Sequence, residues 1–276
     1  MDKLSDTTNI GLTFQMTLDS FLEEQHPGKN ANQKTYEQAL HKLEDVKLCR
    51  SPQKKVAIGL AAREICPDCI ESYMTIGIYT QDIYERMRVL KEGMELATMN
   101  LGKDFFLRDI SDFYDCPEAK PLLHIKFAYA GTLFDAGYMK KAAMQFKELL
   151  NLNPTDIFSA YHYLYAIHLY FEELEACREL LHKYHKNDTF HTYAEFLYLI
   201  KNENIEEAKA MIPKLKFKNR YLYDLITFEA MNTASLHEQV LPGSQEEAGY
   251  IYRILSKVLH TMEYLHIFIV KNDTQS

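Results

Sequence analysis

The stretch HIKFAYAGTLFDAGYMKKAAMQFKELLNLNPTD, residues 124–156, decides the fold. Apolar residues recur at helical spacing over 127–134 and again over 142–150. Gly137 separates the two runs. Pro154 ends the second run, because proline cannot continue a helix and disfavours the helical conformation of its predecessor. The stretch therefore predicts two helices of about four turns joined by a glycine turn, which is an αα-hairpin.

The composition of the 276 residues indicates an all-α protein. The alternating Val and Thr pattern of β-strands is almost absent, and the chain has only 10 Gly and 8 Pro. The 19 Tyr and 15 Phe, with no Trp, provide the large rings that fill the space between stacked hairpins.

Similar helical pairs are predicted on both sides of this hairpin. Before it, residues 35–48 pair with 52–65, and residues 69–82 pair with 83–101. The clearest repeats are 123–156, 157–190 and 189–222. Ala142, Ala176 and Ala208 mark equivalent small positions in the second helix of these three repeats.

Three segments flank or interrupt the array. Residues 1–34 are expected to form an N-terminal helix over 10–25 and a polar linker, and 35–276 to form the array. The 102–121 insertion is expected to contain a short helix around 105–113 that folds back on the array. The SQEE sequence at Ser244 is a capping box, so one last helix over 244–270 is expected to cap the array.

Charge and termini restrict the location and the partners. The formal net charge is −8 and no Lys/Arg stripe occurs, so nucleic acid is not expected as a partner. No apolar run approaches the roughly 18 residues of a membrane span, and MDKLSDTTNIGL is unlike a signal peptide. We therefore expect a cytoplasmic protein that does not bind membranes, with its five cysteines as free thiols.

The 123–156 repeat resembles the tetratricopeptide repeat, a 34-residue helix–turn–helix unit. Small Ala130 and Ala142, the turn glycine Gly137, and the filling residues Phe146 and Leu149 agree with that repeat in one register. The resemblance implies a right-handed α-solenoid of such hairpins with a C-terminal capping helix. The alternative is a chance αα-hairpin.

Longer strings resemble one branch of the tetratricopeptide proteins, the bacterial relatives of the suppressor-of-tumorigenicity family. These strings are AREICPDCIESY, LGKDFFLRDISDFYDCPEAKPLLHIKFAYAGTLFDAGY, LLNLNPTDIFSAYHYLY and LPGSQEEAGYIYR. The resemblance covers roughly residues 55–260. Relatives often carry a tryptophan near Tyr114, and a Thr-Arg-Pro where this chain has Ala-Lys-Pro at 119–121. The family implies a repeat scaffold and supplies no catalytic residues.

In such solenoids the first helix of each hairpin lines the concave groove. Carried onto this sequence, the resemblance gives an aromatic groove with hydroxyl and imidazole tips, suited to a peptide or helix. Its candidate partner-binding residues are His124, Phe127, Phe134, Asp135, Phe158, Tyr161, Tyr165, His168 and Tyr193. The alternative is that some of these aromatics are core, or are covered by the chain's own terminal helices.

Metal and redox chemistry have weaker signals. Cys66-Pro67-Asp68-Cys69 is a CxxC, but a zinc site needs two more ligands, and a thioredoxin-like site needs a βαβ context. The histidines His162, His168, His182, His185 and His191 lie near one another in sequence. The nucleotide-binding, nucleophile-elbow and zinc-protease motifs do not occur. We therefore expect no enzyme activity, no metal and no cofactor.

The sequence favours a non-enzymatic scaffold that binds a protein or peptide partner in the aromatic groove. The alternative is a regulator that senses a small peptide or ligand in the same groove. A weaker alternative is a metal or redox protein centred on Cys66 and Cys69. Alanine at Tyr161 and Tyr165 is expected to abolish partner capture without unfolding the protein.

Overall fold

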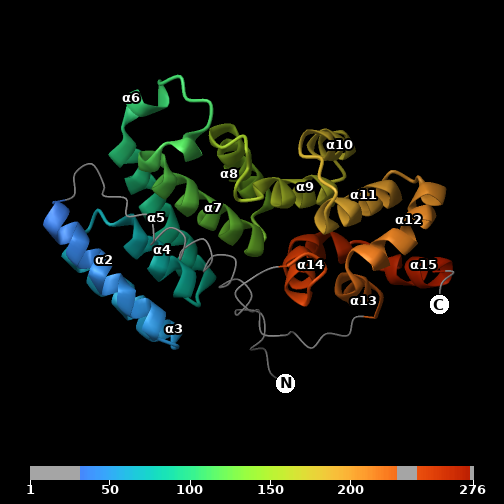
Figure 1. Cartoon of the computed structure of the whole chain (residues 1–276), viewed down its shortest axis with the longest axis horizontal. Helices are drawn as coiled ribbons and strands as arrows, with labels where there is room; N and C mark the ends of the chain where they lie inside the picture. The colour runs from blue at the N-terminus through green and yellow to red at the C-terminus, as the bar shows by residue number, and fades with distance from the viewer. Residues whose placement is uncertain (1–31, 229–240, 274–276) are drawn as a thin grey trace. The chain divides into compact units, whose positions relative to one another are not determined.

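The structure is a computed structural model that describes residues 32–228 and 241–273 (Figure 1). Helices, turns and loops make up these residues, and no strand occurs among them, as the composition predicts. The helix expected over residues 10–25 lies outside the described residues. The chain divides into two compact units, with the boundary between Ala160 and Tyr161.

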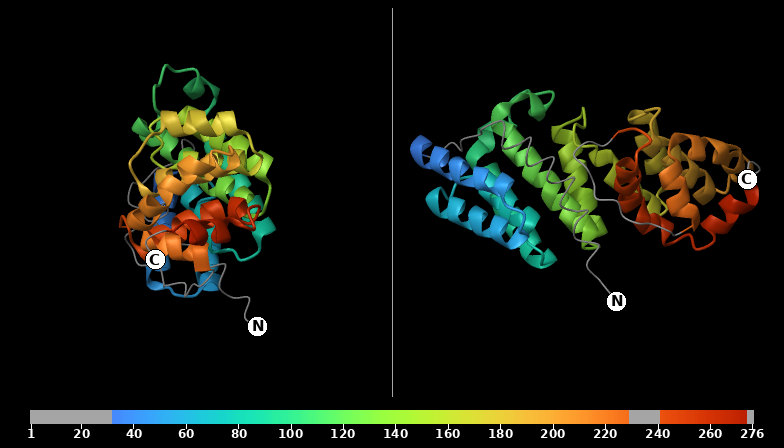
Figure 2. Two further views of the ribbon diagram at one scale, coloured as in Figure 1. Left: turned by 90° about the vertical axis from the view of Figure 1, so that its right-hand side faces the viewer. Right: turned by 60° about the horizontal axis from the view of Figure 1, so that its bottom comes forward.

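The first unit is a row of helices in which each packs against the next (Figures 1 and 2). The contacts run from α2 to α3, α4 and α5, and then past the insertion to α7 and α8. The helices of this unit are α2 Gln33–Leu48, α3 Pro52–Ile65, α4 Ile70–Tyr79, α5 Ile83–Leu101, α6 Lys103–Phe106, α7 Lys120–Asp135 and α8 Met139–Leu152. The helical pairs expected over 35–101 are present.

Local capping explains where these helices begin. Asn32 accepts a hydrogen bond from the Lys34 amide at the start of α2, so the array begins two residues earlier than expected. Ser51 accepts from the Lys54 amide at the start of α3. Asp82 accepts from the Glu85 amide at 2.8 Å at the start of α5.

The insertion does not contain the helix expected over 105–113. Helix α6 ends at Phe106, and only two short 3₁₀ turns follow, η1 Phe113–Asp115 and η2 Pro117–Ala119. The rings of Phe105 and Phe113 lie 5.4 Å apart. A continuous helix would separate residues eight positions apart by about 12 Å along its axis, so this ring contact requires a loop.

The second unit contains the remaining helices. These are α9 Ala160–Tyr170, α10 Leu174–Lys183, α11 Thr189–Lys201, α12 Ile205–Lys218, α13 Arg220–Phe228, α14 Gln245–Leu259 and α15 Leu265–Asn272. Neighbours from α10 to α14 pack in chain order, and α15 packs against α12 and α13. The unit boundary follows the first residue of α9. The sequence pattern also predicts a helix over 220–231, and α13 begins at Arg220, while residues 229–231 lie outside the described residues.

The single last helix expected over 244–270 is two helices. The capping box is present, because Ser244 Oγ accepts from the Glu247 amide at 3.1 Å, but the Glu247 carboxylate returns to the Gly243 amide. Helix α14 ends at Leu259, where Thr261 Oγ1 donates to the Val258 carbonyl at 2.7 Å. A threonine hydroxyl that bonds the last carbonyls competes with continuation of the helix.

Three hairpin turns share one backbone conformation. The residue with positive φ is Gly137 between α7 and α8, Glu172 between α9 and α10, and Glu203 between α11 and α12. In each turn the next amide donates to a carbonyl five residues earlier, at 2.8 to 2.9 Å. This is the Schellman arrangement, in which one left-handed residue closes a helix. Only the first turn has the glycine that makes it visible in the sequence.

The shared turns correct the repeat register. The amides of Ala142, Cys177 and Ala208 each donate to the residue just after the turn's positive-φ residue, so these three positions are equivalent. All three side chains are fully buried. Ala176, the residue expected at this position, is one residue early and partly exposed. The expected positions are 34 and then 32 residues apart, whereas 35 residues separate Ala142 from Cys177 and 31 separate Cys177 from Ala208.

Gly137→Ala is expected to lower the free energy of unfolding by about 1–2 kcal/mol, the cost of a left-handed conformation for an L-residue. An added Cβ at Gly137 would meet nothing within 4 Å, so the effect is conformational rather than steric. Glu203→Gly, in the exposed third turn, is expected to raise stability by about 0.5 kcal/mol. Urea unfolding measures the change in the free energy of unfolding for both variants. A change in the same direction in both would contradict the prediction.

Candidate functional site

A cluster of four rings lies in the first unit and contains three of the predicted binding residues. His124 and Phe127 come from α7, Phe158 from the connection after α8, and Tyr114 from η1 in the insertion. The Phe158 ring lies 5.0 Å from His124, 5.4 Å from Phe127 and 5.9 Å from Tyr114, measured between ring centroids. We call these four residues the Tyr114 cluster.

A buried carboxylate holds the two loop segments of the cluster together. Asp112, two residues before Tyr114, accepts hydrogen bonds from the Asn153 side-chain amide at 2.9 Å and from the Thr155 hydroxyl at 2.7 Å. It also accepts from the backbone amides of Thr155 and Tyr114. Because Phe158 lies three residues after Thr155, the same carboxylate helps to set the positions of Tyr114 and Phe158.

The electrostatics of Asp112 fit this role. Burial by itself raises the pKa of the carboxyl, but the hydrogen bonds from Thr155, Asn153 and the backbone amides outweigh it, so the pKa lies below its usual value. Asn153 is itself buried at the C-cap of α8. There its backbone amide donates to the Leu149 carbonyl, and its side-chain oxygen accepts from the Ile157 backbone amide.

The Tyr114 cluster is open at one edge. His124 and Phe127 are buried, whereas Tyr114 and Phe158 are partly exposed. The neighbouring Ile157 is 56% exposed. The Lys120 Nζ lies 4.9 Å from the Tyr114 ring centroid, within cation–π distance. The edge therefore presents aromatic and aliphatic surface on segments that hydrogen bonds to Asp112 hold together, which suits contact with an apolar side chain of another molecule.

The other predicted binding residues do not join this cluster. Phe134 and Asp135 are at the far end of α7, about 15 Å along the axis from His124. Tyr161, Tyr165, His168 and Tyr193 belong to the second unit. Whether any of these residues contacts a partner stays a prediction.

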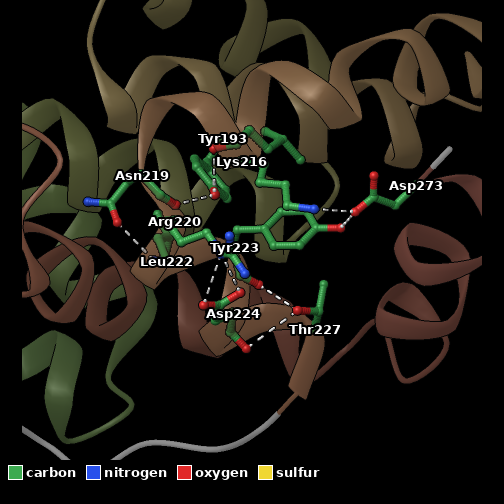
Figure 3. Close-up of polar contacts among 10 residues, drawn as sticks. Tyr193, Lys216, Asn219, Arg220, Leu222, Tyr223, Asp224, Thr227 and Asp273 are labelled. Atoms are coloured by element: carbon green, nitrogen blue, oxygen red, sulfur yellow. Dashed lines mark hydrogen bonds and ion pairs between the residues drawn. The ribbon is translucent and has the colours of Figure 1, made fainter. Parts of the chain in front are cut away.

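The three predicted binding tyrosines of the second unit, Tyr161, Tyr165 and Tyr193, are packed between its helices. Tyr161 stacks on Tyr184 at 4.8 Å, and Tyr165 donates to the Ala194 carbonyl at 2.6 Å. The Tyr193 hydroxyl lies 3.1 Å from both the Leu215 and the Asn219 carbonyl oxygens (Figure 3). Since Tyr161, Tyr165 and Tyr193 are buried, we now expect alanine at Tyr161 and Tyr165 to destabilise the second unit rather than to leave it unaffected.

His168 is buried as well, and its Nδ1 contacts the Glu173 carboxylate at the start of α10. The contact joins the last turn of α9 to the next helix across the hairpin turn. This is a structural role that the predicted groove position did not suggest.

A second polar centre joins distant segments of the second unit. Asn219 caps the end of α12, and its side-chain amide donates to the Glu247 carboxylate and to the Ser244 carbonyl, both at 2.9 Å. The Asp273 carboxylate accepts from Tyr223 at 2.6 Å and from Lys216 at 3.0 Å (Figure 3). Burial and then the bond to Asp273 raise the pKa of Tyr223, so its phenol stays protonated and structural.

The Cys66–Cys69 turn has the properties of a buried structural element. Both thiols are buried, and Cys69 donates to the Glu71 carboxylate at 3.3 Å. Burial, and next the Glu71 charge, raise the pKa of Cys69 well above its usual value, whereas a reactive thiol needs a lowered pKa. Glu71 is also buried and accepts from Tyr36 at 2.5 Å, which ties α4 to α2.

The metal hypotheses gain no support in the described part of the chain. Among residues 32–228 and 241–273, no three His, Cys, Asp or Glu side chains form a group that could hold a metal ion. Of the five histidines in the sequence cluster, only His185 and His191 bring their rings together, at 4.7 Å. Within the same residues, none of the helices combines the length and apolar character that crossing a bilayer requires.

Sequence reasoning missed Asp112, Asn153 and Asn219. One signal was present: Asn153 and Asn219 each follow directly after a helix, where a side chain can bond exposed backbone groups. Their carboxylate partners lie 41 and 28 residues away, respectively, and nothing local identifies them.

Comparison with known proteins adds no relative. No family model matches the chain, and neither a curated protein nor a solved structure matches it at a significant level. The class that fold and site define is therefore an all-α protein of neighbouring helical hairpins with a partly open aromatic cluster. Membership of the tetratricopeptide proteins stays a prediction.

Proposed function

We propose that this protein is a non-enzymatic scaffold for protein–protein interaction, built as a right-handed α-solenoid of tetratricopeptide-like hairpins. The resemblance of 123–156 to that repeat suggests this class, and the identical turns at Gly137, Glu172 and Glu203 support a repeated unit. The C-terminal helices α14 and α15 would close one end of the array. The proposal places the protein in the bacterial cytoplasm, in keeping with five cysteines that all lie in the described residues as free thiols.

The observation that carries the proposal is the open edge of the Tyr114 cluster. Tyr114 and Phe158 offer partly exposed rings beside the exposed Ile157, and the Asp112 network orders both segments before any partner arrives. Rings that are already ordered lose little conformational entropy on binding. Aromatic side chains are also over-represented among residues that dominate interface energies. The partner would be a peptide or helix that inserts an apolar side chain.

Ile157→Asp is expected to reduce partner capture by at least tenfold, because it places a charge directly next in sequence to Phe158 of the apolar edge. No structural change is expected, since the side chain is 56% exposed. A benzoylphenylalanine photo-crosslinker at position 157, used in native lysate, would measure capture directly. The crosslinked partner, once identified by mass spectrometry, then serves for affinity measurements with wild type and variant.

Matched controls use other exposed apolar residues of the first unit. Met144→Asp on α8, at a residue 60% exposed, is expected to leave capture unchanged, and a crosslinker at Leu48, 88% exposed, is expected to give no discrete product. Equal capture by the Ile157→Asp and Met144→Asp variants would show that the Tyr114 cluster does not bind the partner. A product with the mass of a short peptide would favour the ligand-sensing alternative.

A further inference from the structure

One imidazole joins three helices of the second unit. His162 on α9 is buried, and its ring stacks on Phe190 of α11 with 3.6 Å between centroids. Its Nδ1 lies 3.4 Å from the Tyr250 hydroxyl of α14. Its Nε2 has no hydrogen-bond partner among the described residues. The contact between α9, α11 and α14 is thus made by a ring that can take up a proton.

His191, next to Phe190 on α11, is the second member of this group. It is buried, its ring lies 4.7 Å from that of His185, and its Nδ1 finds no partner within the part of the chain that the structure describes. An imidazole with an unpaired buried nitrogen is tolerated when neutral, and the cost rises steeply when it carries a charge.

Lys186 opposes protonation of His162, and His185 and Lys214 oppose protonation of His191. His162 faces Lys186 in the connection before α11, His191 on α11, and the uncharged Tyr250 on α14, and no carboxylate within residues 32–228 and 241–273 forms an ion pair with it. His191 faces His185 and Lys214 of α12, with Asp188 and Glu195 as its acidic neighbours. The Asp188 carboxylate already accepts from the His191 backbone amide.

Burial is the main physical effect on both histidines. Burial, then Lys186 and His191, lower the pKa of His162 well below its usual value. Burial, then His185, lower the pKa of His191, against the smaller opposing influence of Glu195 and Asp188. Between the ordinary histidine pKa of about 6.5 and these lowered values, the unfolded chain binds protons that the folded unit excludes. Stability is therefore full above that window and falls as the pH falls through it.

We propose that the second unit is an acid-sensitive element, in which α9, α11 and α14 stay packed only while His162 and His191 are neutral. Mild acidification then loosens this unit at the His162 contact and exposes the rings of Phe190 and Tyr161 that pack beside it. The inference concerns the second unit alone and is independent of the proposed partner site in the first.

The test is urea unfolding of the full chain at pH 7.5, 6.5 and 5.5. At pH 5.5, one unit below the ordinary pKa, a histidine that stays neutral in the folded protein, as expected of His162, lowers the folded-to-unfolded ratio by about tenfold, and His191 adds a smaller decrease. His162→Phe keeps a ring against Phe190 and cannot be protonated. Between pH 7.5 and 5.5, the folded-to-unfolded ratio of this variant is therefore expected to fall by about tenfold less than that of wild type. His182→Gln, at an exposed histidine of α10, is expected to keep the full wild-type dependence.

A second measurement needs no variant. The carbon-bound imidazole protons of His162, followed by NMR in the folded wild-type protein, are expected to show no titration near pH 6.5. A midpoint near 6.5 with the fold intact would overturn the proposal. The same conclusion would follow if His162→Phe and His182→Gln kept identical pH dependence.

Discussion

Replacement of Tyr165 by alanine is expected to lower the free energy of unfolding by about 3–5 kcal/mol, the range for losing a large buried aromatic side chain. Tyr165 is 0% exposed, its ring lies near Phe190, and its hydroxyl donates to the Ala194 carbonyl at 2.6 Å. Burial also raises the pKa of the phenol well above its usual value, so the hydroxyl remains a donor at any working pH. Urea unfolding measures the loss.

Two further variants separate packing from hydrogen bonding. Tyr165→Phe keeps the ring and removes only the bond to Ala194, so a loss of about 1 kcal/mol is expected. Tyr221→Ala, at a tyrosine of α13 that is 49% exposed, is expected to change stability by no more than about 0.5 kcal/mol. If Tyr165→Ala resembled Tyr221→Ala instead, Tyr165 would not lie in the core of the second unit.

Asp112→Ala is expected to cost about 3 kcal/mol, because it leaves the buried Asn153 amide and the Thr155 hydroxyl without their shared acceptor. The insertion would also lose its bond to the connection after α8, so trypsin should cleave at the exposed Arg108 faster than in wild type. Asp109→Ala, at an exposed acid of the same insertion, is the matched control and should change neither stability nor cleavage.

Protonation of Asp112 removes a charge and protonation of His162 adds one, but both are expected to lower the stability of the folded protein as the pH falls. A carboxyl whose pKa is lowered in the folded state stabilises the protein above its unfolded pKa of about 3.9, and that stabilisation is lost as the pH falls through the lowered value. Asp112→Asn should therefore flatten the stability curve below about pH 4, at a cost of roughly 1–2 kcal/mol near neutrality. If the stability of this variant fell below about pH 4 as steeply as that of wild type, Asp112 would not be the carboxyl responsible.

The candidate site was only partly visible in the sequence. The repeat register grouped His124, Phe127 and Phe158 as one surface, and in the structure the Phe158 ring contacts both of the others. Tyr114 was missed because it lies in the insertion, where no periodicity predicts which ring turns toward α7. The register also assigned Tyr161 and Tyr165 to an open face, but a helix surrounded by neighbours buries residues all round, and periodicity cannot distinguish a groove side from a core side.

The sequence by itself determined the helical class and the bounds of some of the helices. The bounds of α3 and α5 were expected as Pro52–Ile65 and Ile83–Leu101, and the structure has the same bounds. These features depend on apolar periodicity, capping side chains and prolines, whose interactions reach only a few residues along the chain. Tertiary structure decided the one-residue register shift at Cys177, the split of the last helix, and the pairing of Asp112 with Asn153. Each of these choices depends on partners distant in sequence, so local residue preferences leave several solutions open and only the packed chain selects one.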